Sequence, residues 1–155
     1  MVFRAYADLK KGKVMQMVEP KEFLEQVKHY DTHITIKQAE ADKLRAMMLK
    51  ITPTLKQDVV SSSGSQDKLG DAIAKIADLE DEINEAIDNF VTKKREVRSV
   101  IDRIPDSDQY AVISRKYLLY ETLEQIAVEM NMSYRNVCYI HGKALQAVSK
   151  ILEGE

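Results

Sequence analysis

The chain has few of the residues that cross-link small proteins or interrupt their helices. Its 155 residues include one cysteine, no tryptophan, five glycines and three prolines. A single cysteine, Cys138, excludes an intramolecular disulfide and a cysteine-based zinc site. The scarcity of glycine and proline leaves few turn signals, and the abundance of alanine, leucine, glutamate and lysine favours helix. We therefore predict an all-α protein.

Long hydrophobic runs are also missing. No apolar run approaches the roughly 18 residues that a membrane span requires, and the N-terminus lacks the unbroken apolar core of a signal peptide. We expect a cytoplasmic protein. The formal net charge is −2, which counts against simple, tight binding of DNA by the chain as a whole. There is no P-loop, dinucleotide fingerprint or triad-like motif, so we expect neither enzymatic activity nor a cofactor.

Metal-ligand patterns are incomplete. His29 and His33 are four residues apart, a spacing that can hold zinc, but no cysteine or glutamate-histidine signature lies nearby to complete the ligand set. The acidic run at residues 78–88 lacks the glycine-containing loop of a calcium site. We expect no metal site and interpret the acidic run as a solvated helix face.

A first helix is predicted to begin at Glu19-Pro20, because proline suits the first helical position. Apolar residues then recur at alternating steps of four and three, which is the heptad pattern of a coiled coil. This first stripe comprises Phe23, Val27, Tyr30, Ile34, Lys37, Ala41, Leu44, Met48 and Ile51. Thr52-Pro53 is predicted to end the helix. Residues 1–18 show no strong period and are a candidate flexible extension.

A second helix is predicted after a connection at residues 52–67, which contains a Ser-rich stretch at 61–65. Its heptad stripe comprises Leu69, Ile73, Ile76, Glu80, Ile83, Ile87, Phe90, Lys94, Val97, Ile101 and Ile104. Pro105 ends it. Two long helices joined by one loop predict a coiled-coil-like antiparallel hairpin over residues 19–104. Its apolar flanks at Leu24, Leu49, Leu79 and Val91 predict a homo-oligomer, most simply a homodimer, formed through this hairpin.

Charge patterning agrees with an antiparallel register. Pairing Ile51 with Leu69 brings the basic run at residues 93–98 alongside Glu19, Glu22 and Glu25. The basic run then has two interpretations, which are ion pairing within the chain and contact with DNA. We favour ion pairing, because charge runs usually lie on solvated helix faces.

Three shorter helices are predicted over residues 105–155. Asp106 and Gln109 resemble a capping box that starts the first of them, whose buried stripe is Tyr110, Ile113 and Tyr117. After a break at residues 119–121, Thr122 and Gln125 form a second capping box. Asn131 tolerates the left-handed conformation of a tight turn, and Ser133 can cap a last helix that runs to about residue 152.

The spacing of the last two helices matches the packing scheme of a helix-turn-helix, counted from Leu123. Two helices crossing at a wide angle need apolar contacts at fixed positions, a small residue where they touch and a residue that tolerates positive φ at the turn. Ala127 is the small residue and Asn131 the turn residue. The apolar positions are Ile126, Met130, Met132, Val137 and Ile140. An ordinary amphipathic helix corner is the alternative.

The last helix, at Ser133–Leu145, resembles the recognition helix of bacterial sigma factor region 4. Residues 113–118 and 122–127 are similar to the earlier helices of that region. From about Lys21 onward, including the Ser62-Ser63-Gly64-Ser65-Gln66-Asp67-Lys68 stretch, the chain resembles phage late-gene transcription regulators of the RinA and ArpU type. The resemblance implies a phage- or prophage-encoded protein in a bacterial host.

The resemblance also implies which residues contact double-stranded DNA. Tyr134 and Arg135, then Cys138 and Tyr139 one turn later, would face the major groove, and Arg135 could pair with guanine. Four positions would contact phosphates, namely Lys143, Arg115, Thr122 and Ser133. Asn136, at the edge of this face, could reach adenine or a phosphate. For Tyr134 and Tyr139, packing against the neighbouring helix or a partner protein is the alternative.

Three functions follow from these patterns. The leading one is a phage-type transcription regulator that binds promoters and acts near host RNA polymerase. The second is a small terminase-like subunit that binds phage packaging DNA, which a ring-shaped oligomer would favour. The third is a protein-interaction module that docks on RNA polymerase without binding DNA. In each case the organisation would be a hairpin at residues 19–104 followed by a helix-turn-helix domain at 105–155.

Overall fold

The computed structural model describes residues 19–57 and 63–154, and within them the chain is all-helical, as predicted. The five helices are α2 (Pro20–Gln57), α3 (Ser63–Ile101), α4 (Ser107–Leu118), α5 (Leu123–Glu129) and α6 (Tyr134–Glu153). The extension predicted at residues 1–18 lies outside the described residues. In the described ranges, no helix combines the length and apolar character that crossing a bilayer demands.

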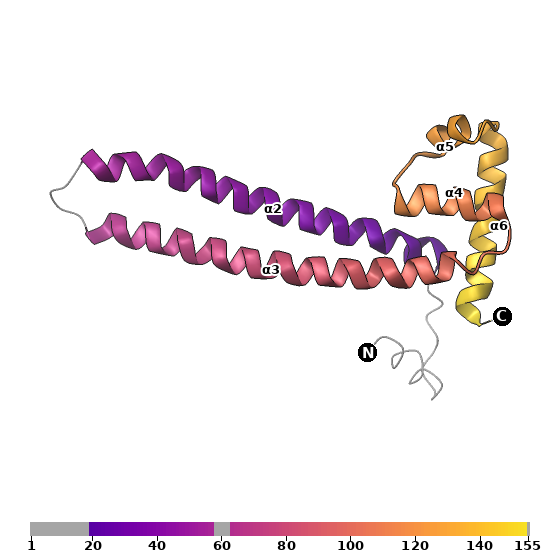
Figure 1. Cartoon of the computed structure of the whole chain (residues 1–155), viewed down its shortest axis with the longest axis horizontal. Helices are drawn as coiled ribbons and strands as arrows, with labels where there is room; N and C mark the ends of the chain where they lie inside the picture. The colour runs from indigo at the N-terminus through magenta and orange to yellow at the C-terminus, as the bar shows by residue number, and fades with distance from the viewer. Residues whose placement is uncertain (1–18, 58–62, 155) are drawn as a thin grey trace.

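The two long helices, α2 and α3, lie side by side and extend away from the other three (Figure 1). They contain 38 and 39 residues, or about 57 Å of helix each at 1.5 Å per residue. The first predicted stripe is the contact face of α2, because its residues from Phe23 to Met48 are all buried or half-buried. Two ion pairs join the helices, Lys37 with Glu82 and Arg45 with Glu80.

The contact face of α3 differs from the prediction at three positions. The predicted residues Ile73, Glu80 and Ile87 are exposed. The residues just before them face α2 instead, so the buried or half-buried set is Leu69, Ala72, Ile76, Leu79, Ile83, Ala86 and Phe90. With this set facing α2, the Glu80 carboxylate stays in water and avoids the free-energy penalty of burying a charge.

Two predicted helix ends were wrong. α2 continues through Thr52-Pro53 to Gln57, and α3 begins at Ser63, so part of the predicted connection is helical. A proline inside a helix removes one donor and can kink the helix without ending it. The remainder of the Ser-rich stretch, Ser61 and Ser62, lies outside the described residues.

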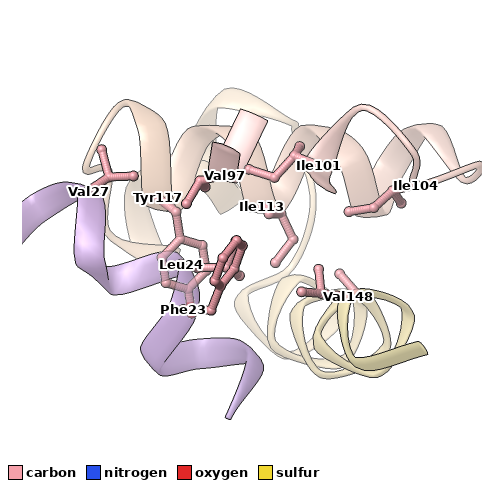
Figure 2. Packing of buried hydrophobic residues seen from close by; sticks show 10 residues of the cluster. Phe23, Leu24, Val27, Val97, Ile101, Ile104, Ile113, Tyr117 and Val148 are labelled. Carbon is pink, nitrogen blue, oxygen red and sulfur yellow. The ribbon is translucent and has the colours of Figure 1, made fainter. Parts of the chain in front are cut away.

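The base of the α2–α3 pair and the C-terminal helices share one hydrophobic core (Figure 2). From α2 come Phe23, Leu24 and Val27, all at most 7% exposed. The other helices and the link after α3 contribute Val97, Ile101, Ile104, Ile113, Tyr117, Ala144 and Val148. Leu24, predicted as an apolar flank open to a second hairpin, is instead fully buried against these helices. The long pair is therefore fixed to α4 and α6 by packing as well as by the chain.

Candidate nucleic-acid interface

The helix starts around the candidate site are capped by the predicted side chains. The Thr122 hydroxyl accepts from the Gln125 backbone N–H at 3.2 Å, and the Gln125 side chain accepts from the Thr122 N–H at 2.8 Å. Ser133 accepts from the Asn136 N–H at 3.2 Å and starts α6. These bonds satisfy backbone donors that have no partner within a helix, so they define where α5 and α6 begin.

The turn between α5 and α6 is tight. Asn131 has a positive φ of 52°, as its side chain predicts, and the Met132 N–H donates to the Ala127 carbonyl at 2.9 Å. Ala127 is only 6% exposed, in the cluster where α5, α6 and α4 pack together. A larger side chain at Ala127 would push these helices apart.

A second hydrophobic cluster joins α4, α5 and α6. Its buried members are Val112, Ile126, Ala127 and Val137, and the residues packed against them are Leu123, Met130, Met132 and Ile140. Every apolar position expected for packing α5 on α6 therefore belongs to this cluster. This packing holds the N-terminal half of α6 in place and leaves its opposite side in solvent.

The exposed side of α6 carries most of the predicted contact residues. Tyr134 is 50% exposed and Tyr139 is 63% exposed, and Arg135, Asn136 and Lys143 are also exposed. The Lys143 ammonium lies 5.7 Å from the centre of the Tyr139 ring, a cation–π distance that keeps the charge beside the aromatic surface. Two aromatic rings and two cations are therefore exposed on the first three turns of α6.

Three of the predicted residues, Asn136 among them, have contacts within the protein. Cys138 is half-buried, and the Asn136 side-chain amide lies 3.5 Å from the Met132 sulfur. Arg115 donates to the Glu121 carboxylate at 3.1 Å, with both side chains partly buried. A phosphate would have to compete with Glu121 for Arg115, which makes Arg115 the least available of the predicted phosphate contacts.

An acidic residue that the sequence analysis did not single out borders this surface. A hydrogen bond from the backbone N–H of Glu124 itself lowers the pKa of the Glu124 carboxyl, and a hydrogen bond with the Thr122 side chain lowers this pKa further. Glu124 is therefore an anion at neutral pH. Contact with Cys138 raises the pKa of the Tyr134 hydroxyl, and the Glu124 charge adds to that effect. The sequence contains a signal for Glu124, because it lies in the first turn of α5, two residues after Thr122. An acidic side chain at that position interacts favourably with the helix dipole as an anion.

The ion-pair partners predicted for the basic run at residues 93–98 were wrong. Lys93 pairs with Glu96 of its own helix at 2.6 Å, and Lys94 lies over the Phe90 ring. Across the described chain, no ion pair joins this run to Glu19, Glu22 or Glu25. Neighbours three or four residues apart on one helix meet without any long-range arrangement, which explains why local partners are used.

Over residues 19–57 and 63–154, no group of three or more histidine, cysteine, aspartate or glutamate side chains is arranged to hold a metal ion. His29 and His33 are both exposed on α2.

Comparison with known proteins gives one family. The model of a family described as "Protein of unknown function (DUF1492)" matches residues 49–150, which include the end of α2, all of α3, α4 and α5, and all but the last three residues of α6. No curated protein and no solved structure matches the chain.

Proposed function

The chain belongs to the DUF1492 family, and we propose that it is a phage-type transcription regulator whose α5–α6 unit binds promoter DNA as a helix-turn-helix. The observation that carries the proposal is the exposed N-terminal half of α6. There Arg135, Tyr139 and Lys143 follow one another at intervals of four residues and form one exposed stripe, with Tyr134 exposed beside it, on a helix fixed by the tight turn at Asn131.

The proposal assigns roles to both parts of the molecule. Helices α4, α5 and α6 would be a domain like sigma factor region 4, and α2 with α3 would be a coiled-coil-like antiparallel hairpin. The likeness of residues 113–118, 122–127 and 133–145 to region 4 supports this assignment, as does the resemblance to the RinA and ArpU type of regulator. Both would place the protein in a bacterial host cell, acting at promoters beside host RNA polymerase.

Direct contact with bases would come from the first turns of α6. Arginine presents a planar fork of donors that matches the two acceptors of guanine in the major groove. Arg135 is the exposed arginine at the start of α6, so it would set base preference. Tyr134 and Tyr139 offer apolar surface that suits thymine methyl groups, and Lys143 would contact a phosphate.

Charge limits how tightly one such unit can bind. Residues 106–155 carry five lysines or arginines against seven aspartates or glutamates, a formal charge of −2. Binding to DNA depends strongly on phosphate neutralisation and counterion release. One α4–α6 domain would therefore bind DNA weakly, and useful affinity would require several linked copies or contacts with polymerase.

A second candidate function is docking on a protein, such as RNA polymerase, without DNA contact. It is favoured by two large apolar side chains near the turns that flank α5. Val128 is 79% exposed and Leu119 is 63% exposed. A partner protein that covered these side chains would remove their apolar surface from water, which would stabilise the complex. Glu124 is compatible with this alternative, because a carboxylate repels DNA phosphates.

Gel-shift titration of the full chain separates these candidates. DNA enriched from host and phage genomic fragments would first supply a specific target. Arg135→Ala should then weaken binding to that target by about 5- to 150-fold, as for loss of one base contact. Lys143→Ala should weaken binding to specific and random DNA alike. Lys150→Ala, exposed at the other end of α6, is the matched control.

Three outcomes distinguish the functions. Enrichment of sequences upstream of phage late genes, lost on Arg135→Ala, supports the regulator. Enrichment of a packaging site would support the terminase-like alternative. Absence of salt-sensitive binding to any DNA would overturn both and leave the protein-docking function.

A further inference from the structure

α3 carries a second heptad stripe that is exposed. It follows the same alternation of four and three residues as the buried stripe, displaced by about one residue around the helix. We call it the α3 outer stripe, and it consists of Ile73, Ala77, Glu80, Asn84, Ile87 and Val91. Its three large apolar members are 53%, 37% and 47% exposed. A helix with two adjacent heptad stripes is suited to packing against two other helices.

The α2–α3 pair has little core of its own beyond its base. Among residues 28–50 and 67–96, only Ile34, Ala41 and Ile83 are buried, and the other contact residues remain half-exposed. Two isolated helices of this length cover only one side of each other. A further helix on the α3 outer stripe would therefore bury apolar side chains that the pair leaves in water.

Charge restricts what that helix can be. Residues 78–88, the middle of α3, contain six acidic and no basic side chains. A second α3 would bring acidic side chains against acidic side chains. The helix that fits must instead combine apolar residues with positive charge.

This chain contains such a helix surface on the outside of α2. Within residues 43–50 this outer surface carries Lys43 and Lys50 and no acidic side chain. The α2 outer stripe follows the same heptad alternation and is exposed throughout, and it consists of Ile36, Glu40, Lys43, Met47 and Lys50. α3 already accepts α2 cations within one chain, because Glu82 and Glu80 pair with Lys37 and Arg45.

The two outer stripes point to opposite sides of the helix pair. Arg45 reaches Glu80, a member of the α3 outer stripe, so Arg45 marks the side of α2 that this stripe adjoins. Lys43 and Met47 are each two residues from Arg45. Two residues correspond to about 200° around an α-helix, so the α2 outer stripe points away from that side.

We propose that the chain self-associates head to tail, with the α3 outer stripe of one copy packed against the α2 outer stripe of a second copy. Because each copy keeps one stripe free after the first contact, the association continues until it closes into a ring or extends further. A symmetric pair that uses both stripes in one interface is not compatible with their opposite orientation. The proposal does not depend on DNA binding.

Complementary variants of the full chain test this arrangement. The first variant, Ile73→Glu with Ile87→Glu, disables only the α3 outer stripe. The second variant, Lys43→Glu with Met47→Glu, disables only the α2 outer stripe. All four side chains are exposed, so circular dichroism should show wild-type helix content for both. Val128→Glu, a charge placed at an exposed apolar position of α5, is the control.

Sedimentation velocity should give wild-type and Val128→Glu oligomers larger than a dimer, and monomers for each double variant alone. An equal mixture of the two double variants should give a complex of two chains, because one intact stripe of each kind remains. The proposal is overturned if wild type is a monomer, or if a double variant with wild-type helix content associates as wild type does. A mixture that stays monomeric would also overturn it.

Discussion

The hydroxyl of Tyr117 in α4 lies 3.0 Å from Nε2 of His141 in α6, and the two rings stack with centroids 5.8 Å apart. Burial lowers the pKa of His141, and the nearby Lys116 and Lys21 lower it further. Burial likewise raises the pKa of Tyr117 to about 12, with a smaller effect from Glu25. At neutral pH the Tyr117 hydroxyl is therefore protonated and His141 is neutral, and a hydrogen bond joins them at the point where α2, α4 and α6 meet.

This pair predicts a pH-dependent stability. Because folding lowers the pKa of His141 below 6.5, the unfolded chain takes up a proton more readily than the folded chain. The contribution of His141 to the free energy of unfolding should therefore be fully present above about pH 7, and it should decrease as the pH drops below that value. Urea denaturation between pH 7.5 and 5 measures this change.

His141→Gln should reduce that pH dependence. Its stability at neutral pH should fall by about 0.5–1.5 kcal/mol, because the bond to Tyr117 is lost or weakened. His33→Gln, at an exposed site on α2, should leave the pH dependence of wild type in place. If His141→Gln loses stability with acid as steeply as wild type, then other groups cause the loss.

Asn131 predicts an unusual order among substitutions at the turn. Its φ of 52° is a conformation that glycine adopts without strain and that alanine resists. Asn131→Gly should change stability by a few tenths of a kcal/mol, and Asn131→Ala should lower it by about 1–2 kcal/mol. Equal stability of the two variants in thermal melts would show that the turn does not require positive φ.

Ala127 tests the contact between α5 and its neighbours. Ala127→Leu adds bulk where only 6% of the residue is exposed and should cost about 1–3 kcal/mol. The adjacent Val128→Leu adds a similar side chain at a site that is 79% exposed, and it should be nearly neutral. The difference between the two melting temperatures is the measurement, and no difference would argue against close packing at Ala127.

Local signals in the sequence were sufficient wherever one residue determines its own backbone. Thr122, Ser133 and Asn131 behave as predicted, because a cap or a left-handed turn depends on a few adjacent atoms. The sequence did not determine which residues of α3 face α2. Steps of three and four around Leu69, Ile76 and Ile83 leave two candidate stripes. Which of them forms the contact depends on which side chains pack well against α2. The heptad pattern alone contains no information about that partner.

The sequence also did not predict partners that depend on the path of the chain between two helices. Arg115 was predicted to be open to phosphate, but the turn after α4 returns Glu121 to it. Leu24 looked like a surplus apolar residue beside the first stripe, because the sequence does not reveal that α4 and α6 fold back over the base of α2. The partners of both residues depend on how the chain turns between helices, and the helix patterns in the sequence do not specify these turns.

Leu24 therefore supplies a final prediction, which concerns the connection between the two parts of the molecule. It is fully buried in the core that α2 shares with α4 and α6, so Leu24→Ala should cost about 2–5 kcal/mol. Leu49→Ala, at a site on the same helix that is 74% exposed, is the control and should cost little. Because the core is shared, hydrogen exchange of Leu24→Ala should show faster exchange in α6 as well as in α2.

A fragment containing residues 106–155 would lack Phe23, Leu24, Val27, Val97 and Ile101, and it should be much less stable than the full chain. If that fragment melts as cooperatively and at the same temperature as the full chain, the C-terminal helices do not depend on the long pair.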